Sequence, residues 1–239
     1  MTVVYTENWQ AHLGVKEVPA IARAAHARDA KVLVDKTWGI QHFQPFQHGV
    51  DVSIQAATKY PAGHSDVLIG SVTVNSDVDW QRLHATVRGL GQYAGPDDCW
   101  LTLRGMRTMG VRLAQQMDSA MEVAHWLRKR PEVKQVLLPA LPGALGHAIW
   151  KRDFTGACSL FGVEFHQEYS AESMHAFAEA LELFGIGASW GGFESLALPP
   201  TGFVTRTGSA AKFAGALVSL HIGLEDVNDL MSDLAQARR

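Results

Sequence analysis

The sequence predicts an α/β region followed by a smaller α+β region, and three observations favour this arrangement. Short apolar runs alternate with helix-like segments in the N-terminal part of the chain, as expected of strands buried on both faces of a sheet. A long helical pattern of apolar side chains then runs from Met106 to Leu127. Beyond it, strand-like and helix-like runs are segregated, which is typical of an α+β domain.

In the first region, a helix is expected from Val18 to Ala27, because apolar residues recur there at helical spacing. Three apolar runs follow and are predicted to be strands, at residues 31–35, 50–54 and 67–74. The first strand ends in the carboxylate of Asp35, and the second leads into Lys59.

In the second region, the helix that begins near Met106 is predicted to end before Pro131, which cannot continue a helix. Further strands are expected at residues 133–138, 159–165 and 217–222, and further helices at residues 172–183 and 224–234. The change of pattern places a domain boundary near Gly105. It divides the chain into residues 1–105 and residues 106–239.

Composition narrows the class of protein. Of the 239 residues, 47% are hydrophobic and 19% are charged, which is an ordinary globular balance. Lysine and arginine number 21 and acidic residues 24, for a net charge of −3, so no basic surface for nucleic acid is expected. The two cysteines are far apart in sequence, which favours a reducing compartment. No signal-peptide pattern and no membrane-length apolar run are present, so we expect a soluble, cytoplasmic protein.

Asp35 and Lys59 are the first candidates for chemistry. Both follow predicted strands, and open α/β sheets bind ligands beyond the carboxyl ends of their strands. Position alone favours structural roles, however, since an aspartate at a strand end commonly caps a turn and a lysine there is commonly solvated. His64 lies in a Gly-His-Ser-Asp run, but adjacency in sequence does not make a catalytic triad. The histidines show no metal-binding spacing such as HExxH.

The sequence around Lys59 belongs to a series of motifs that carries more information. Five segments resemble, in the same order and with similar spacing, motifs of the Cys/Met-metabolism enzymes that depend on pyridoxal 5'-phosphate (PLP). The bacterial cystathionine β-lyase branch of that family is the most similar. The segments are Val32–Trp38, Gln55–Asp66, Leu103–Met109, Ser189–Leu196 and Leu220–Asp226.

This resemblance implies a fold and a set of roles. The chain would form the C-terminal part of a PLP fold-type I large domain, of the aspartate-aminotransferase type, followed by the small α+β C-terminal domain. Lys59 would be the catalytic lysine that forms the Schiff base with PLP. Asp35 would bind the pyridine nitrogen, and Thr58 the cofactor phosphate. Ser189 and Trp190 would lie beside the substrate carboxylate.

The resemblance also implies an activity. The protein would be a PLP-dependent carbon–sulfur lyase of transsulfuration and methionine biosynthesis, which converts L-cystathionine to homocysteine, pyruvate and ammonia by β-elimination. Its partners would be a small amino-acid substrate and further copies of the same chain, in a tetramer. Neither nucleic acid nor a membrane is expected as a partner.

The late start of the match and Ser219 support an alternative, a catalytically inactive fragment or pseudoenzyme, and Lys36 is a further departure from the family pattern. Family members carry a long stretch before the region that Val3–Glu7 matches, and this stretch supplies a phosphate cradle. Ser219 stands where the family has the arginine that binds the substrate carboxylate, and serine cannot form the paired bonds of a guanidinium. Lys36 replaces an asparagine beside Asp35, and Ala56 replaces a serine found in many relatives.

Overall fold

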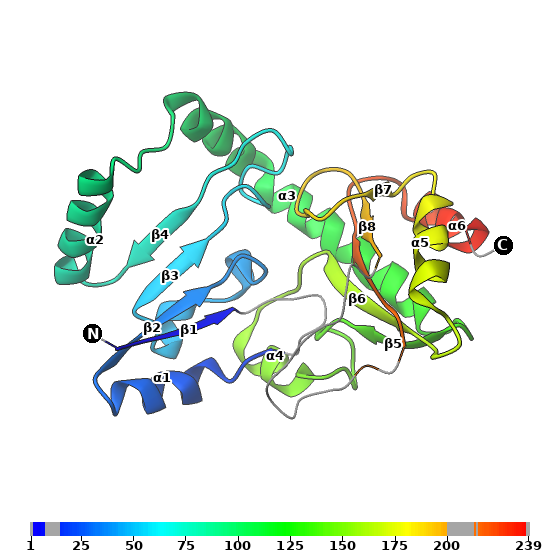
Figure 1. Ribbon diagram of the computed structural model, residues 1–239, viewed down its shortest axis with the longest axis horizontal. Helices are drawn as coiled ribbons and strands as arrows, with labels where there is room; N and C mark the ends of the chain where they lie inside the picture. The colour runs from blue at the N-terminus through cyan, green and yellow to red at the C-terminus, as the bar shows by residue number, and fades with distance from the viewer. Residues whose placement is uncertain (1, 8–14, 200–212, 214, 238–239) are drawn as a thin grey trace.

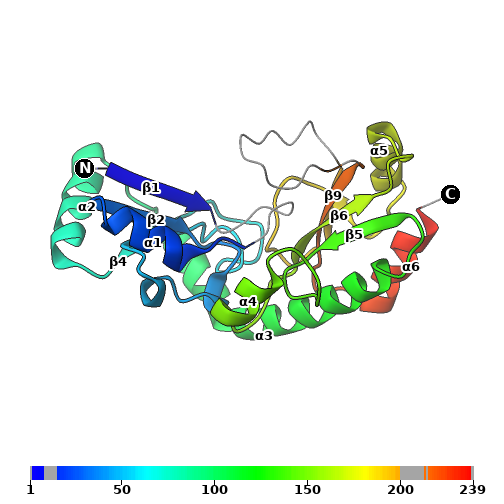
Figure 2. The same cartoon turned by 90° about the horizontal axis from the view of Figure 1, so that it is seen from below.

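The structure is a computed structural model that describes residues 2–7, 15–199, 213 and 215–237. It contains two sheets, and the long helix α3 (Pro96–Leu127) extends from beside the first sheet to run along the second (Figures 1 and 2). A single hydrophobic core includes side chains from both halves of the chain. The indole nitrogen of Trp38, for example, donates a hydrogen bond to the carbonyl of Leu160 in the second sheet at 3.0 Å.

The first sheet has the strand order β1-β2-β3-β4. Its strands are β1 (Thr2–Glu7), β2 (Ala30–Asp35), β3 (Val52–Gln55) and β4 (Ser71–Val74). The first three are parallel, and β4 runs antiparallel to β3. Helix α1 (Val18–His26) connects β1 to β2 and buries Val18, Ala22 and Ala25. Two short 3-10 helices, η1 (Ile40–His42) and η2 (Pro45–His48), connect β2 to β3.

The predicted helix at 18–27 and the strands at 31–35 and 50–54 are confirmed within two residues at each end. The third strand is shorter than predicted, and the expectation that it is buried on both faces is wrong. Three of the four residues of β4 are exposed, because β4 is an edge strand that pairs only with β3 among the described residues. The sequence analysis also did not predict α2 (Asp77–Leu90), which follows β4 and is mostly exposed.

The second sheet has the strand order β5-β6-β9-β8-β7. Its strands are β5 (Val133–Leu137), β6 (Leu160–Phe165), β7 (Gly185–Ile186), β8 (Leu196–Leu198) and β9 (Leu217–His221). All neighbouring pairs are antiparallel except β7 and β8. The helices in this half are α4 (His147–Asp153), α5 (Ala171–Glu179) and α6 (Val227–Gln236). The predicted β5, β6, β9, α5 and α6 are therefore confirmed, whereas α4, β7 and β8 were not predicted.

Helix α3 begins ten residues before the position predicted for it. Pro96 stands in its first turn together with Asp97 and Asp98, and both a proline and acidic side chains favour a helix N-terminus. Trp100, Leu103 and Met106 are largely exposed, so this end lacks the one-sided apolar pattern from which a helix is predicted. The proposed domain boundary at Gly105 falls within α3, so one helix belongs to both halves.

Candidate functional site

Lys59 lies in a tight turn that follows β3. Its backbone N–H donates to the carbonyl of Ala56 at 3.1 Å, and its own carbonyl accepts from the N–H of Gly63 at 2.8 Å. The side chain is half-buried, and this burial lowers the pKa of the Lys59 amine below its ordinary value. Lys59 Nζ donates to Ser189 Oγ at 2.7 Å. The structure thus joins two predicted site residues that are 130 positions apart.

Trp190 supplies one wall beside the Lys59 amine. Lys59 Nζ lies 5.3 Å from the centroid of the Trp190 ring, a distance that permits a cation–π contact when the amine is charged. The ring is 5% exposed and packs against the ring of Tyr60 with a centroid separation of 5.5 Å. Trp190 is therefore a core side chain that also borders the Lys59 amine.

Asp35 is connected to the Lys59 turn through a residue that the sequence analysis did not single out. Asp35 Oδ1 accepts from both the N–H and the hydroxyl of Thr37, at 2.8 and 2.5 Å. The same hydroxyl oxygen accepts from the N–H of Ala56 at 2.8 Å. Thr37 therefore fixes the carboxylate at the end of β2 to the turn after β3. Among the described residues, no hydrogen bond joins Asp35 Oδ2 to the protein.

The hydroxyl of Thr58 is engaged with the backbone of Ile69. It accepts from the Ile69 N–H at 2.8 Å and donates to the Ile69 carbonyl at 3.1 Å. These bonds anchor the segment before β4 to the Lys59 turn. A phosphate could accept a hydrogen bond from Thr58 only if the donation to Ile69 were given up.

The side chain of Lys36 turns away from Asp35. Its Nζ donates to the carbonyl of Ile40 at 3.1 Å, and burial lowers the pKa of the amine. Lys36 therefore serves the connection between β2 and η1, and the structure gives it no bond to the neighbouring carboxylate.

Ser219 lies in β9, opposite Gly162 of β6 and Leu198 of β8. It is 9% exposed. At this position in the interior of the sheet, serine carries no charge and is much shorter than the arginine that the family has there.

Behind the Lys59 turn lies a buried polar cluster, comprising Tyr60, Ser159 and His221. The hydroxyls of Tyr60 and Ser159 lie 3.2 Å apart, and Ser159 Oγ lies 3.0 Å from His221 Nδ1. His221 Nε2 accepts from the N–H of Gly191 at 3.1 Å. Sequence reasoning quoted His221 as part of a motif but gave it no role, because its partners come from segments that are distant in sequence.

The loop that carries Ser189 is fixed at its other end as well. Glu225 accepts hydrogen bonds from both the N–H and the hydroxyl of Ser195, at 2.7 and 2.8 Å. Leu224 N–H donates to the carbonyl of Phe193 at 2.8 Å. The two C-terminal motifs found in the sequence therefore form one structural unit.

Two further findings concern what the described part of the chain lacks. No group of three or more histidine, cysteine or carboxylate side chains within it is arranged to hold a metal ion. None of its helices combines the length and apolarity required to cross a bilayer.

Comparison with known proteins agrees with this geometry. The family model for Cys/Met metabolism PLP-dependent enzymes matches residues 1–239. A Rhizobium johnstonii protein is 46% identical over 224 residues, which cover 92% of this chain and 56% of the relative. Cystathionine beta-lyase MetC of Escherichia coli is 43% identical over 227 residues, which cover 92% of this chain and 57% of the relative.

Among solved structures, apo CalE6, a methionine gamma lyase from Micromonospora echinospora, aligns with a TM-score of 0.90 at 31% identity. That alignment covers 99% of this chain and 65% of the other. The fold is therefore that of the PLP fold-type I enzymes, as the sequence predicts. The chain spans little more than half the length of the curated relatives it matches. It belongs to the Cys/Met metabolism PLP-dependent enzyme family.

Proposed function

We propose that the protein is a PLP-dependent carbon–sulfur lyase that converts L-cystathionine to homocysteine, pyruvate and ammonia. One observation carries the proposal: the half-buried amine of Lys59, with its lowered pKa, donates to Ser189 at 2.7 Å beside the ring of Trp190. A lysine whose pKa is lowered has a larger fraction of neutral amine at physiological pH, and only the neutral form is a nucleophile or a base.

The residues present fit PLP at two points of the cofactor. The Lys59 amine could bind its aldehyde carbon, and Asp35 Oδ2 could accept a hydrogen bond from a protonated pyridine nitrogen. Thr58 is a third candidate, for the phosphate, at the expense of its bond to Ile69. When bound, PLP would supply an electron sink for the charge that develops as the substrate loses its α-proton.

The side chains of the chain itself have distinct tasks in this proposal. Lys59 would carry the proton removed from the substrate α-carbon. The Ser189 hydroxyl would hold the Lys59 amine in position by accepting its hydrogen bond, and Trp190 would keep water from one side of that amine. Asp35, oriented by Thr37, would stabilise positive charge on the ring nitrogen.

Ser219 favours the alternative, a catalytically inactive fragment or pseudoenzyme. Loss of a bidentate arginine clamp costs on the order of a few kcal/mol in positioning a carboxylate. A Ser219→Arg variant should therefore lower the KM for cystathionine if the remaining machinery is competent. Unchanged and undetectable turnover in both proteins would favour the inactive alternative.

We also propose that the active form is a homo-oligomer, a tetramer by family resemblance, and that the chain divides near Gly105 into a cofactor-binding part and a C-terminal domain. Large exposed apolar side chains, including Trp80, Leu90, Tyr93 and Trp100, support an interface on α2 and the N-terminal half of α3. Light scattering of the purified protein would measure the mass of the assembly. A monomer at working concentration would contradict the oligomer.

The decisive experiment mixes purified protein with PLP and records the visible absorbance of a lysine Schiff base. Borohydride reduction followed by peptide mapping should place the cofactor on Lys59. Lys59→Ala should abolish both the absorbance and pyruvate release from cystathionine. Lys151→Ala, which removes an exposed amine of α4, is the matched control and should change neither. Labelling of another lysine in folded protein would contradict the proposal.

A further inference from the structure

The ring of His221 joins two segments behind the proposed active site. It lies at the end of β9 and is 1% exposed. Nδ1 is 3.0 Å from the hydroxyl of Ser159, and Nε2 is 3.1 Å from the backbone nitrogen of Gly191. The proposed chemistry does not use this side chain.

The contacts of the ring select one of its protonation states. Burial lowers the pKa of His221 to about 4, so the ring is neutral at physiological pH. The bond from the Gly191 N–H requires an unprotonated Nε2, which leaves the single proton on Nδ1, directed toward Ser159. The carbonyl of Gly192 lies 3.3 Å from Nε2 but accepts a closer bond from Gln116 Nε2, at 2.7 Å. This tautomer satisfies the Gly191 N–H and the Ser159 hydroxyl, and it leaves Nε2 and the Gly192 carbonyl as two acceptors 3.3 Å apart.

Gly191 is the point at which the Ser189 loop meets the backbone of Lys59. Its φ of +83° lies in the left-handed region. A Cβ atom at this position would lie 2.9 Å from the nitrogen of Tyr60 and 3.0 Å from the carbonyl carbon of Lys59. The two backbones are thus in direct contact, so the position of the Gly191 N–H determines where the loop begins its path toward Lys59.

Ser189 stands two residues before Gly191, and its hydroxyl accepts the hydrogen bond from Lys59 Nζ. A shift of Gly191 would therefore move the acceptor away from the amine. Tyr60, which follows Lys59 directly, is bound to the same ring through Ser159. His221 consequently holds both the residue after Lys59 and the loop that contacts the Lys59 amine.

We propose that His221 is a positioning residue for Lys59. In its Nδ1–H tautomer it holds Gly191, and thereby keeps the Ser189 hydroxyl against the Lys59 amine. The consequence for catalysis rests on the proposed function, but the effect of His221 on the Lys59 amine does not. It can be measured in protein without cofactor.

Two substitutions separate the two sides of the ring. His221→Gln places an amide oxygen near the position of Nε2 and keeps an acceptor for Gly191. His221→Asn places its amide near the position of Nδ1, so it keeps a donor for Ser159 and loses the acceptor for Gly191. Both variants remove the imidazole from the core, so a purely structural role predicts the same consequences for both.

The readouts are the pKa of Lys59, from NMR titration of labelled lysine amines assigned with Lys59→Ala, and amide hydrogen exchange at Gly191. His221→Gln should retain the lowered pKa and slow exchange. His221→Asn should shift the Lys59 pKa further down, because the Ser189 oxygen no longer accepts a hydrogen bond from the charged amine. Exchange at Gly191 should be roughly tenfold faster, as expected for one lost hydrogen bond. Indistinguishable variants, or an unchanged Lys59 signal in both, would overturn the proposal.

Ser159→Ala provides an independent test should His221→Asn fail to fold. It removes the acceptor of the Nδ1 proton together with the contact to the Tyr60 hydroxyl, so the ring can adopt the other tautomer and release Gly191. The same two readouts should shift in the direction of His221→Asn, and wild-type values would overturn the proposal. If the shifts appear but PLP never binds, the positioning role stands and the proposed function fails. If PLP binds to Lys59 but the shifts are absent, the proposed function stands and the positioning role fails.

Discussion

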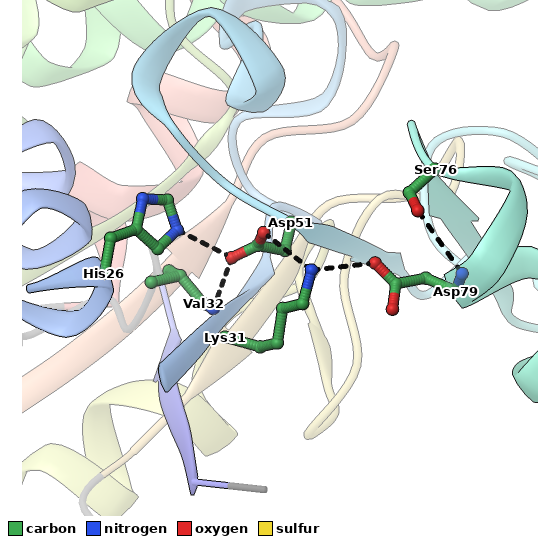
Figure 3. A network of polar contacts seen from close by, with 6 residues as sticks. All are labelled: His26, Lys31, Val32, Asp51, Ser76 and Asp79. Carbon is green, nitrogen blue, oxygen red and sulfur yellow. Dashed lines mark hydrogen bonds and ion pairs between the residues drawn. The ribbon is translucent and has the colours of Figure 1, made fainter. Parts of the chain in front are cut away.

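The two ends of the first sheet carry the same residue types in different electrostatic surroundings. At the amino ends of β2 and β3, Lys31 Nζ lies 3.3 Å from Asp51 Oδ1 and 3.0 Å from Asp79 Oδ2 (Figure 3). At the carboxyl ends of the same strands, Lys59 contacts a neutral hydroxyl and an aromatic ring. A lysine and nearby aspartates thus occur at both ends, but only the first lysine is paired with carboxylates.

The pKa shifts of the two lysines follow from these partners. The bond to Asp79 raises the pKa of Lys31, with a further contribution from Asp51. Burial lowers the pKa of Lys59, and no carboxylate opposes it. The comparison shows that the pKa of a lysine near a strand end rises or falls according to its partners and its burial. Position alone does not decide between the two.

The most direct test of the difference between Lys31 and Lys59 is to give Lys59 a carboxylate partner. In Ser189→Asp, the new charge should raise the pKa of Lys59 and keep the amine protonated. Pyruvate release from cystathionine at neutral pH should then fall about 100-fold or more, the magnitude associated with loss of a general base. Ser189→Ala removes the contact without adding charge, so its loss should be smaller. Equal losses in the two variants would show that charge is not the controlling factor.

A second test concerns the close contact of Gly191 with the backbone of Lys59 and Tyr60. Gly191→Ala should lower the free energy of unfolding by about 4 kcal/mol, because the left-handed backbone and the close approach to Tyr60 both oppose a Cβ. Gly143→Ala is the matched control, since its φ is +80° but no atom lies within 4 Å of the added Cβ. It should cost only about 1 kcal/mol. Urea denaturation of both variants measures the difference, and similar values would contradict the close contact.

The stability of the protein should also depend on the protonation of His221, which lies behind the Lys59 turn. The folded-state pKa of His221, about 4, is below the ordinary 6.5, so the unfolded chain binds the extra proton first. Stability is therefore lost as the pH falls from 6.5 to 4. His221→Gln lacks this loss, so its stability relative to wild type should rise by about 3 kcal/mol between pH 7 and pH 4. If the free energy of unfolding of the two proteins changed with pH in parallel, the low folded-state pKa of His221 would be refuted.

The smallest expected effect is at the opposite end of the sheet. Burial alone would raise the pKa of Asp51, but bonds from the Val32 N–H, His26 and Lys31 lower it overall. Its stabilisation is present above the ordinary carboxyl pKa of 3.8 and disappears as the pH falls through the lower folded value.

Asp51→Asn should therefore cost about 1–2 kcal/mol at neutral pH, and the difference from wild type should vanish in strong acid. Thermal unfolding across pH measures it. Lys31→Gln, which removes a partly exposed cation, should cost less than about 1 kcal/mol. Neither substitution should alter the Lys59 pKa, and a shift there would show that the two ends are coupled.

The sequence predicted elements with either of two apolar patterns. Helices α1 and α6 have a one-sided apolar pattern, and strands β2, β6 and β9 are short apolar runs. Helix α2 was missed because it is mostly exposed and has no one-sided apolar pattern; its signals are local, an N-cap at Ser76 and a left-handed Gly91 at its C-terminus. The length of β4 was overestimated because an apolar composition does not reveal that a strand lies at an edge.

Within the candidate site, the motifs identified residues but not their mutual contacts. Lys59, Ser189 and Trp190 were named from the sequence, and the structure brings them together; their roles remain predictions. Thr37 and Ser159 were not named, because a threonine or a serine acquires a special role only from its partners. Ser159 meets His221 across 62 positions, and no local pattern records a contact of that kind.

Helix α3 has a mechanical consequence for the site. Gly105 lets the helix approach the carbonyl of Ala62, where a Cβ would lie only 2.0 Å from the oxygen. Arg112, from the same helix, donates to the carbonyl of Tyr60 at 2.9 Å, and Gln116 donates to that of Gly192 at 2.7 Å. One continuous helix thus braces both the Lys59 turn and the Ser189 loop. A displacement of α3 is therefore expected to move the Lys59 turn and the Ser189 loop together.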